Sequence, residues 1–389
     1  MTKLLSLKNL LNEEVMASKK KDEIISEASP HTIKKFTLIK EYVESWAYKL
    51  LNTHKCNSLV FIDCMCNSGE YIDKEGQQIF GTPVRVSSIL AECAKKYPRK
   101  EIYLYLNDYS QDKINHLSQL IQYAIPNLHI EMSVKDGNEL LKDIASKVTD
   151  NDYTSYLLVY DPYDASIDWE AIFPYINHWG EVIINHMLSD STRAVKVAKR
   201  EETIRKYENT YLSDIESLIP YGSDKNAYEK RVEEIIGRLH YRNNYYIASF
   251  PFFNERNAIV YNLIHCTNSI VGFRLYKQVA WKVFGGKSST LRTFGEEQQL
   301  MFDFDNVGTV TTTAFEDCYY IKDIADYLQQ IFNGQQNVLY EVVWGKLDAH
   351  PVFPADGFKT EIKKLLKDNH GATIGKSGIS FCTIKDKTI

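Results

Sequence analysis

Two segments place carboxylates directly after apolar runs, and these are the residues whose types and spacing could do chemistry. Residues 59–69 read LVFIDCMCNSG, so an apolar run ends at Asp63 and is followed by small and polar residues up to Gly69. Residues 156–164 read YLLVYDPYD, a second apolar run that ends at Asp161. A buried strand that opens into a glycine-containing turn is a common way to build a nucleotide-binding loop. The sequence therefore predicts a ligand loop between Asp63 and Gly69.

The second segment resembles a methyl-transfer signature. Asp161-Pro162-Tyr163 is close to the Asp/Asn-Pro-Pro-Tyr sequence of enzymes that methylate exocyclic amines. The lone pair of such an amine is delocalised into the ring, so hydrogen-bond acceptors must draw the nitrogen toward a tetrahedral, attacking geometry. The Asp161 carboxylate and the Pro162 carbonyl could accept these hydrogens while Tyr163 stacks on the base. The alternative is a proline-fixed turn that ends a strand and supplies a carboxylate to a cleft.

The elements that must position these residues alternate along the chain. Apolar strand patterns lie near 59–63, 102–107, 128–133, 156–160 and 181–186, with helical patterns between them. This alternation predicts an α/β fold with a doubly wound, mostly parallel Rossmann-like sheet. Its ligand crevice is expected at the carboxyl ends of the strands, with Asp63 and Asp161 on the same edge. Two later apolar runs are expected to close the sheet as an antiparallel pair.

The chain is long enough for more than one unit. Its 389 residues exceed a comfortable single core. Glycines and hydroxyl residues after position 284 break the helical periodicity, which indicates a linker. The last part has helical patterns and a strand pair around the turn GKSG, which is the size and order of a winged helix-turn-helix. The predicted divisions are a polar segment at 1–28, a Rossmann-like domain at 29–283 with a helical insertion at 190–243, a linker at 284–319 and a winged-helix-like domain at 320–389.

Several sequence blocks together resemble one protein family. They are KKFTLIKEYVESW, FIDCMCNSGEY, the Gly-Thr-Pro at 81–83, VYDPYD, VIINH and YNLIHCTNSIVGF, and they run through residues 30–283. In these blocks the chain is similar to the three-Cys-motif partner protein family (TcmP), a bacterial and phage-associated group. The resemblance implies a fold like that of S-adenosylmethionine-dependent methyltransferases, with a C-terminal winged helix-turn-helix in some members. It implies S-adenosylmethionine as cofactor but no particular substrate.

The resemblance also assigns cofactor contacts. In a methyltransferase-type sheet the amino-acid end of the donor lies against the first turn, and an acidic residue after the second strand holds the ribose. These roles would fall to Asp63, Asn67 and Gly69, and to Asp108, with Asp136 near the adenine. The family has two glycines around this loop, whereas the chain has Asn67 and Ser68 before the single Gly69, which restricts the approach of the backbone to a ligand. The alternative for Asp108 and Asp136 is a helix cap or turn.

Any contact with nucleic acid has to be local, because the chain carries a net charge of −5. Asn185, at the end of VIINH, could line the crevice or hydrogen-bond a neighbouring turn. Basic residues follow it, mixed with glutamates that favour a solvated face: Arg193, Lys196, Lys199, Arg200, Arg205 and Lys206. Four more basic residues share a predicted C-terminal helix with an apolar face, and this helix could enter a major groove or be an ordinary amphipathic helix. They are Lys359, Lys363, Lys364 and Lys367, opposite Phe358, Ile362, Leu365 and Leu366.

The cysteines indicate neither disulfides nor a metal. Seven cysteines without paired spacing are typical of reduced thiols in a cytoplasmic protein. Cys64 and Cys66 are expected to share one face of a strand end, but a pair without a second CxxC or a histidine cluster falls short of a zinc site. No stretch approaches 18 uncharged apolar residues, so no membrane span or secretion signal is predicted.

Two functions from different classes fit these observations. The first is S-adenosylmethionine-dependent methylation of a nucleic-acid amine, which the Asp-Pro-Tyr turn favours. The second is a catalytically degenerate nucleic-acid-binding protein that acts with another protein, encoded nearby, in a bacterial or phage defence or mobile-element system. The altered loop favours this second function. A metal-dependent nuclease or hydrolase would need a paired acidic motif, which the sequence lacks.

Overall fold

A seven-stranded sheet organises the molecule. The computed structural model describes residues 24–177, 179–187, 201–211, 233, 235–237, 239, 245–292 and 318–383. The strand order is β6-β5-β2-β7-β8-β10-β9. The five strands from β6 to β8 in this order run parallel to one another, whereas β10 runs antiparallel to both β8 and β9. The bounds are β2 Ser58–Asp63, β5 Glu101–Asn107, β6 Leu128–Ser133, β7 Thr154–Tyr160, β8 Gly180–His186, β9 Tyr246–Phe253 and β10 Ile259–Thr267.

The sheet confirms the predicted α/β architecture. Each of the five predicted parallel strands is present within two residues of its expected bounds, and the two later apolar runs pair as antiparallel strands. The strand order reverses between β2 and β7, so the switch point at which ligands bind in such sheets lies between these two strands. Asp63 ends β2 and Asp161 follows β7, and the two strands are parallel. The two carboxylates therefore lie on the same edge, as predicted.

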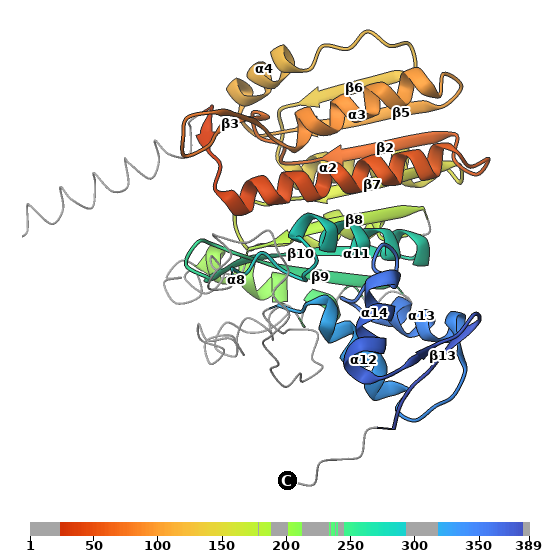
Figure 1. Cartoon of the computed structure of the whole chain (residues 1–389). Helices are drawn as coiled ribbons and strands as arrows, with labels where there is room; N and C mark the ends of the chain where they lie inside the picture. The colour runs from red at the N-terminus through yellow and green to blue at the C-terminus, as the bar shows by residue number, and fades with distance from the viewer. Residues whose placement is uncertain are drawn as a thin grey trace, which may run out of the picture.

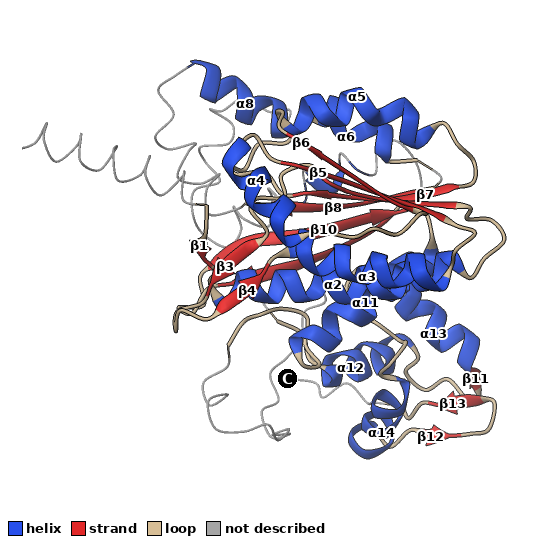
Figure 2. Ribbon diagram, turned by 90° about the horizontal axis from the view of Figure 1, so that it is seen from above, coloured by secondary structure: helices blue, strands red, loops and turns tan. Residues whose placement is uncertain are grey.

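Helices cover both faces of the sheet. Figure 2 shows α2 (Pro30–Leu51), α3 (Thr82–Lys96) and α11 (Ile270–Phe284) on one face, and α5 (Gly137–Thr149), α6 (Trp169–Ile172) and α8 (Glu201–Tyr211) on the other. α4 (Gln111–Leu120) follows β5. Helix α2 begins as the sequence predicts, with the Ser29 hydroxyl accepting from the backbone N–H of Thr32 and a proline at the first helical position. The described helices include none long and apolar enough to cross a membrane.

A small second sheet was not predicted. It joins β1 (Ser26–Glu27), β3 (Glu70–Ile72) and β4 (Gln78–Phe80) in the order β1-β3-β4. The end of the predicted polar segment 1–28 therefore pairs with the chain that leaves the ligand loop. Strands of two or three residues are too short to show a periodicity, so the sequence gives no signal for them. Residues 1–23 and most of the predicted insertion at 190–243 lie outside the described residues.

The C-terminal unit has three helices and a three-stranded antiparallel sheet. The helices are α12 (Ile321–Ile331), α13 (Tyr340–Ala349) and α14 (Lys359–His370). The strands β11 (Val338–Leu339), β12 (Thr373–Ile374) and β13 (Gly378–Ser380) form a sheet in the order β11-β13-β12. The predicted strand pair around GKSG is β12 and β13. The predicted apolar face of α14 is also confirmed, because Ile362, Leu365 and Leu366 are buried. Residues 293–317 of the predicted linker lie outside the described residues.

Helix α11 anchors this unit to the large sheet (Figure 1). Lys277 is 1% exposed, and its Nζ donates to the carbonyls of Leu347 at 2.8 Å and His350 at 2.7 Å. Trp281 Nε1 donates to the carbonyl of Val352 at 3.0 Å. The last carbonyls of α13 lack partners within their own helix, and the helix dipole favours a positive charge at this end. Burial lowers the pKa of Lys277 to about 7. The hydrogen bonds to the Leu347 and His350 carbonyls offset the cost of burying this amine.

We expect Lys277→Met to loosen this anchor. The substitution leaves buried carbonyls without their donor, which costs about 2–4 kcal/mol of unfolding free energy. Urea unfolding measures the loss. Lys282→Met is the matched control, because Lys282 lies on the same helix with a side chain that is 75% exposed, and its effect should stay within about 0.5 kcal/mol. Equal effects of the two substitutions would contradict the anchor.

Candidate active site

The candidate site is a cluster of carboxylates at the carboxyl ends of β2, β5 and β7. Asp63 ends β2 and is 3% exposed, Asp161 follows β7, and Asp108 follows β5 and is 1% exposed. Burial, assisted by the nearby negative charge of Asp161, raises the pKa of Asp63 to about 8. A buried carboxylate beside a second negative charge resists ionisation, so Asp63 holds a proton at neutral pH.

Asp161 is held by two partners from opposite sides. The ammonium of Lys35 on α2 forms an ion pair with Asp161 Oδ2, and Asn185 Nδ2 at the end of β8 donates to Oδ1 at 2.5 Å. The Asp161 side chain is 27% exposed. A carboxylate has about four lone-pair sites, so these partners leave acceptor capacity toward the crevice. Sequence reasoning named Asn185 but missed Lys35. The sequence signal for Lys35 was its place on the apolar stripe of α2, because it precedes Ile39 by four residues and so shares its face of the helix.

The predicted ligand loop is tightly constrained. Asn67 and Gly69 have φ angles of 60° and 76°, which lie in the left-handed region. A Cβ atom on Gly69 would lie 2.5 Å from Leu117 Cδ1 and 2.8 Å from Val84 Cγ2, so only glycine fits there. The backbone N–H of Asn67 donates to Asp108 Oδ2 at 3.1 Å. Asparagine tolerates the left-handed region better than most residues, so the loop keeps its shape although the chain lacks one of the family glycines.

Tyr163 spans the crevice in this structure. Its hydroxyl donates to Asp108 Oδ2, while Asp108 Oδ1 accepts from the backbone N–H of Ser110 at 3.0 Å. The Tyr163 ring meets Tyr109 edge to face at 5.3 Å, and Lys113 Nζ lies 5.2 Å from the Tyr163 ring centroid. Because β5 and β7 flank β2, this side chain crosses the end of β2. Its hydroxyl therefore binds the carboxylate that the sequence assigns to the ribose. Burial, and then the Asp108 charge, raise the pKa of Tyr163.

The side chains of Asp136 and Asn107 hydrogen-bond to backbone groups. Asp136 Oδ1 accepts from the backbone N–H groups of Asn138 at 2.9 Å and Glu139 at 3.2 Å, so Asp136 caps α5, as the alternative interpretation holds. Asn107, which sequence reasoning missed, ends β5 and is fully buried. Its Nδ2 donates to the carbonyls of Cys64 at 2.9 Å and Lys135 at 3.0 Å. Asn107 thus holds the ends of β2 and β6 together beside the crevice. A polar residue closing the apolar run EIYLYLN was the available signal.

The two cysteines do not share a face, which corrects the prediction. Strand β2 ends at Asp63, and the chain turns at once. Cys64 packs in the core cluster that contains Ile62, whereas Cys66 packs in the cluster that contains Phe61. Burial raises the pKa of both thiols. No group of three or more His, Cys, Asp or Glu side chains among the described residues is placed to hold a metal ion.

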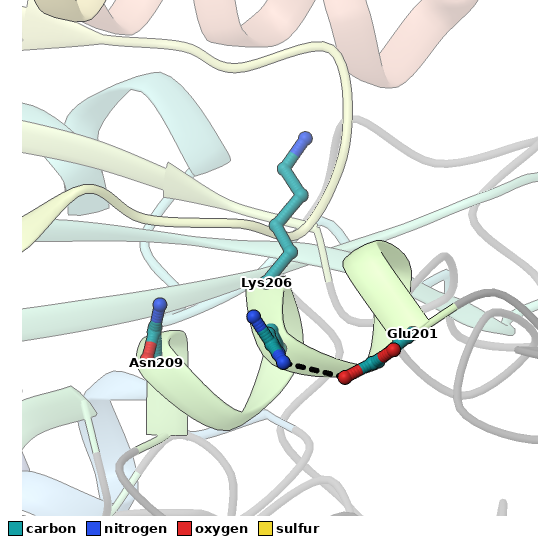
Figure 3. Close-up of a pocket in the computed structure, with 4 residues that line it drawn as sticks. Glu201, Lys206 and Asn209 are labelled. Atoms are coloured by element: carbon teal, nitrogen blue, oxygen red, sulfur yellow. Dashed lines mark hydrogen bonds and ion pairs between the residues drawn. The ribbon is translucent and has the colours of Figure 1, made fainter.

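The basic residues of α8 are paired with carboxylates. Arg205 Nη2 lies 2.5 Å from Glu201 Oε1 on the same helix, which fits the solvated-face interpretation. Lys206 Nζ lies 2.5 Å from Asp164 Oδ2 and so fixes the turn after Tyr163. Burial raises the pKa of Asp164, but hydrogen bonds from Lys206 and Ser166 outweigh it and hold that pKa below its ordinary value. Figure 3 shows the polar hollow that these α8 side chains line. Outside the described residues lie Arg193, Lys196, Lys199 and Arg200.

The predicted nucleic-acid lysines lie on α14, in the C-terminal unit and not at the crevice. Lys359 pairs with Asp356 at 2.7 Å, and Lys363 Nζ lies 3.9 Å from the ring centroid of Tyr340. Lys364 and Lys367 are exposed. The structure therefore groups the sequence-predicted residues into two separate places. These are the crevice, where Asp63, Asn67, Gly69, Asp108, Asp161, Pro162, Tyr163 and Asn185 converge, and α14.

Comparison with known proteins finds only remote similarity to solved structures. Neither a protein-family model nor a curated protein matches the sequence. Human methyltransferase-like protein 13 in complex with SAH is 8% identical, with a TM-score of 0.31 over 69% of this chain and 97% of that one. SAH-bound Podospora anserina methyltransferase PaMTH1 is 9% identical, with a TM-score of 0.24 over 66% and 94%. A DUF574-family protein from Streptomyces avermitilis is 9% identical, with a TM-score of 0.28 over 60% and 83%. The class that the sheet itself defines is a Rossmann-like, doubly wound α/β protein.

The raised pKa of Asp63 predicts a pH-dependent stability. Its folded-state value of about 8 lies above the ordinary 3.8, so the folded protein holds a proton that the unfolded chain has released. The contribution of Asp63 is complete below about pH 4 and is lost as the pH rises through about 8. We therefore expect Asp63→Asn to gain unfolding free energy relative to wild type between about pH 5 and pH 8, by about 1 kcal/mol or more. Asp136→Asn keeps a helix cap and should change nothing in this profile. Parallel profiles for wild type and Asp63→Asn would contradict the assignment.

Proposed function

We propose that this protein is an S-adenosylmethionine-dependent methyltransferase that acts on an exocyclic amine of a nucleic acid. The observation that carries the proposal is the meeting of Asp63, Asp108 and Asp161 with a left-handed glycine loop at the switch point of the sheet. In Rossmann-like methyltransferases the last strand of the doubly wound sheet runs antiparallel and is inserted between the fifth and sixth strands. Strand β10 has this place, because it lies antiparallel between β8 and β9. The sequence resemblance to the TcmP family points to the same fold, and membership of that family stays a prediction.

The residues present fit the cofactor. The loop from Cys64 to Gly69 offers backbone and a protonated Asp63 to its amino-acid end. Asp108 offers a buried carboxylate to the ribose, where a sugar hydroxyl would replace the Tyr163 hydroxyl on Oδ2. When bound, the cofactor supplies an electrophilic methyl group on a sulfonium. The assignment of Asp136 to the adenine remains a prediction, and its capping of α5 leaves one carboxylate oxygen for that contact.

Asp161 and Pro162 would act on the amine. Lys35 pairs with the Asp161 carboxylate and Asn185 fixes its orientation, so its remaining lone pairs would accept an amine hydrogen. The Pro162 carbonyl accepts the second hydrogen. The bound cofactor would supply a methyl group to the amine nitrogen, and the Asp161 carboxylate would accept the proton that the amine then loses. Tyr163, released from Asp108, would stack on the base.

A second candidate is a nucleic-acid-binding partner protein without catalysis. Two contacts favour it, because the Tyr163 hydroxyl occupies Asp108 and the Lys35 ammonium occupies Asp161. The C-terminal unit suits nucleic-acid binding in either case. Its order α12-β11-α13-α14-β12-β13, with the sheet order β11-β13-β12, supports the proposal of a winged helix-turn-helix in which α14 would enter the major groove. A protein partner in a defence or mobile-element system belongs to this candidate.

Titration with S-adenosylhomocysteine separates the two candidates. We expect wild type to bind, and Tyr163→Phe to bind roughly threefold to tenfold more tightly, because it removes a competing hydrogen bond worth about 0.5–1.5 kcal/mol. Asp108→Ala should bind roughly tenfold to a hundredfold more weakly. Tyr153→Phe is the control, since Tyr153 is 57% exposed and distant from the crevice. If wild type does not bind at millimolar ligand, the enzyme is excluded and the partner protein is the better account.

Transfer of a radiolabelled methyl group tests the chemistry. The acceptors are pools of random-sequence single-stranded DNA and RNA, and the donor is labelled S-adenosylmethionine. Asp161→Ala should lower transfer by roughly a hundredfold or more while S-adenosylhomocysteine affinity stays within about twofold, because the carboxylate acts on the amine in the transition state. Tyr153→Phe serves as the control, because Tyr153 precedes β7 at the end of the strand opposite Asp161. Undiminished transfer by Asp161→Ala would remove Asp161 from the chemistry.

A further inference from the structure

A basic pocket lies at the beginning of α2. It has a volume of about 250 Å³ and is lined by three cationic side chains, Lys34, Lys287 and Arg292, which come from separate parts of the chain. The carboxylate that lines it, Glu255, lies 2.5 Å from Lys74 Nζ and 4.0 Å from Arg292 Nη2. Because the whole chain has a net charge of −5, this excess of positive charge is a local feature and not a consequence of composition.

The pocket is built on fixed backbone. Asn257 Nδ2 donates to the carbonyl of Arg292 at 2.8 Å, and the N–H of Arg292 donates to Asn257 Oδ1 at 3.0 Å. The Thr290 hydroxyl accepts from the N–H of Phe253 at 2.7 Å. These bonds fasten the segment after α11 to the β9–β10 hairpin. The segment that carries Lys287 and Arg292 is therefore fixed before a ligand arrives, which lowers the cost of binding. Two of the cations also donate to backbone carbonyls, Lys34 Nζ to Val283 at 2.9 Å and Lys287 Nζ to Leu291 at 2.7 Å.

The pocket adjoins the crevice through one helical turn. His31 lines the pocket, and Lys35, four residues later on the same face of α2, pairs with Asp161. Tyr261 links the two, with its ring centroid 5.8 Å from that of His31 and 5.3 Å from Lys35 Nζ. Strand β9 runs parallel to β8 and ends at Phe253, so this side of the pocket lies on the same edge of the sheet as Asp161.

We propose that this pocket binds a backbone phosphate of the nucleic acid whose base enters the crevice at Asp161. The inference rests on the proposed function and names how its acceptor is held. A phosphodiester carries one negative charge and offers only acceptor oxygens, which match ammonium and guanidinium donors. A base drawn out of its stack brings its flanking phosphates to the mouth of the crevice. Contacts to these phosphates position the strand without reading its sequence.

The test compares two double substitutions that remove the same charge. Lys34→Gln with Arg292→Gln changes two exposed side chains of the pocket. Lys49→Gln with Lys55→Gln is the matched control, because Lys49 lies at the other end of α2 and both side chains are exposed. Binding of a fluorescent single-stranded DNA oligonucleotide is measured against salt concentration. We expect the pocket variant to bind roughly tenfold more weakly at low salt and to lose about 0.7 units of slope for each phosphate contact removed. The control should match wild type.

Two further measurements make the result specific. An oligonucleotide with uncharged methylphosphonate linkages should bind wild type and the pocket variant equally, because it presents no phosphate charge. S-adenosylhomocysteine affinity should be the same in all variants. If wild type binds the oligonucleotide and the pocket variant keeps its affinity and slope, or the control weakens equally, the phosphate site is overturned and the proposed function stands. If wild type binds no oligonucleotide, the nucleic-acid acceptor falls as well, and cofactor affinity alone then reports on the methyltransferase.

Discussion

The ion pair between Lys35 and Asp161 is the interaction on which the crevice depends. Parallel strands bring Asp63 and Asp161 to neighbouring strand ends, where Asp63 is buried and the negative charge of Asp161 disfavours a second charge on it. The structure resolves this conflict by giving Asp161 an ammonium and leaving Asp63 protonated at neutral pH. Helix α2 must therefore lie where its first turns reach the strand ends, and its apolar stripe holds it against the sheet in that position.

The crevice is closed by its own side chains. Asp108 binds the loop at Asn67 and the Tyr163 hydroxyl, and Asp161 binds Lys35 and Asn185. Asp108 and Asp161 already have protein partners, so a ligand would displace the Tyr163 hydroxyl from Asp108 and use the remaining lone pairs of Asp161. Tyr163 connects the two halves of the site, because it belongs to the turn that would act on the amine and touches the residue that would hold the cofactor. Both candidate functions must account for the hydrogen bond from the Tyr163 hydroxyl to Asp108.

Helix α11 links the sheet to the C-terminal unit. One side of it packs on the sheet, and the other offers Lys277 and Trp281 to the carbonyls that follow α13. Buried polar contacts of this kind are costly to break, since each freed carbonyl loses its partner away from water. These contacts fasten α13 and the segment after it, and with them the C-terminal unit that carries α14, to the large sheet.

The sequence by itself determined the sheet and the places of Asp63, Asn67, Gly69, Asp108 and Asp161 at its strand ends. These features follow from local periodicity and from the rule that crossovers are right-handed, and both are properties of neighbouring residues. Only the tertiary structure decided that Lys35 meets Asp161 across 126 positions of sequence and that Tyr163 turns to Asp108 across 55. It also decided that Asp136 caps α5 and that Cys64 and Cys66 face different cores. The Asp136 cap is a local contact, which the sequence offered as one of two interpretations. The other contacts depend on how distant elements pack and where a strand stops, and no short stretch of sequence encodes either.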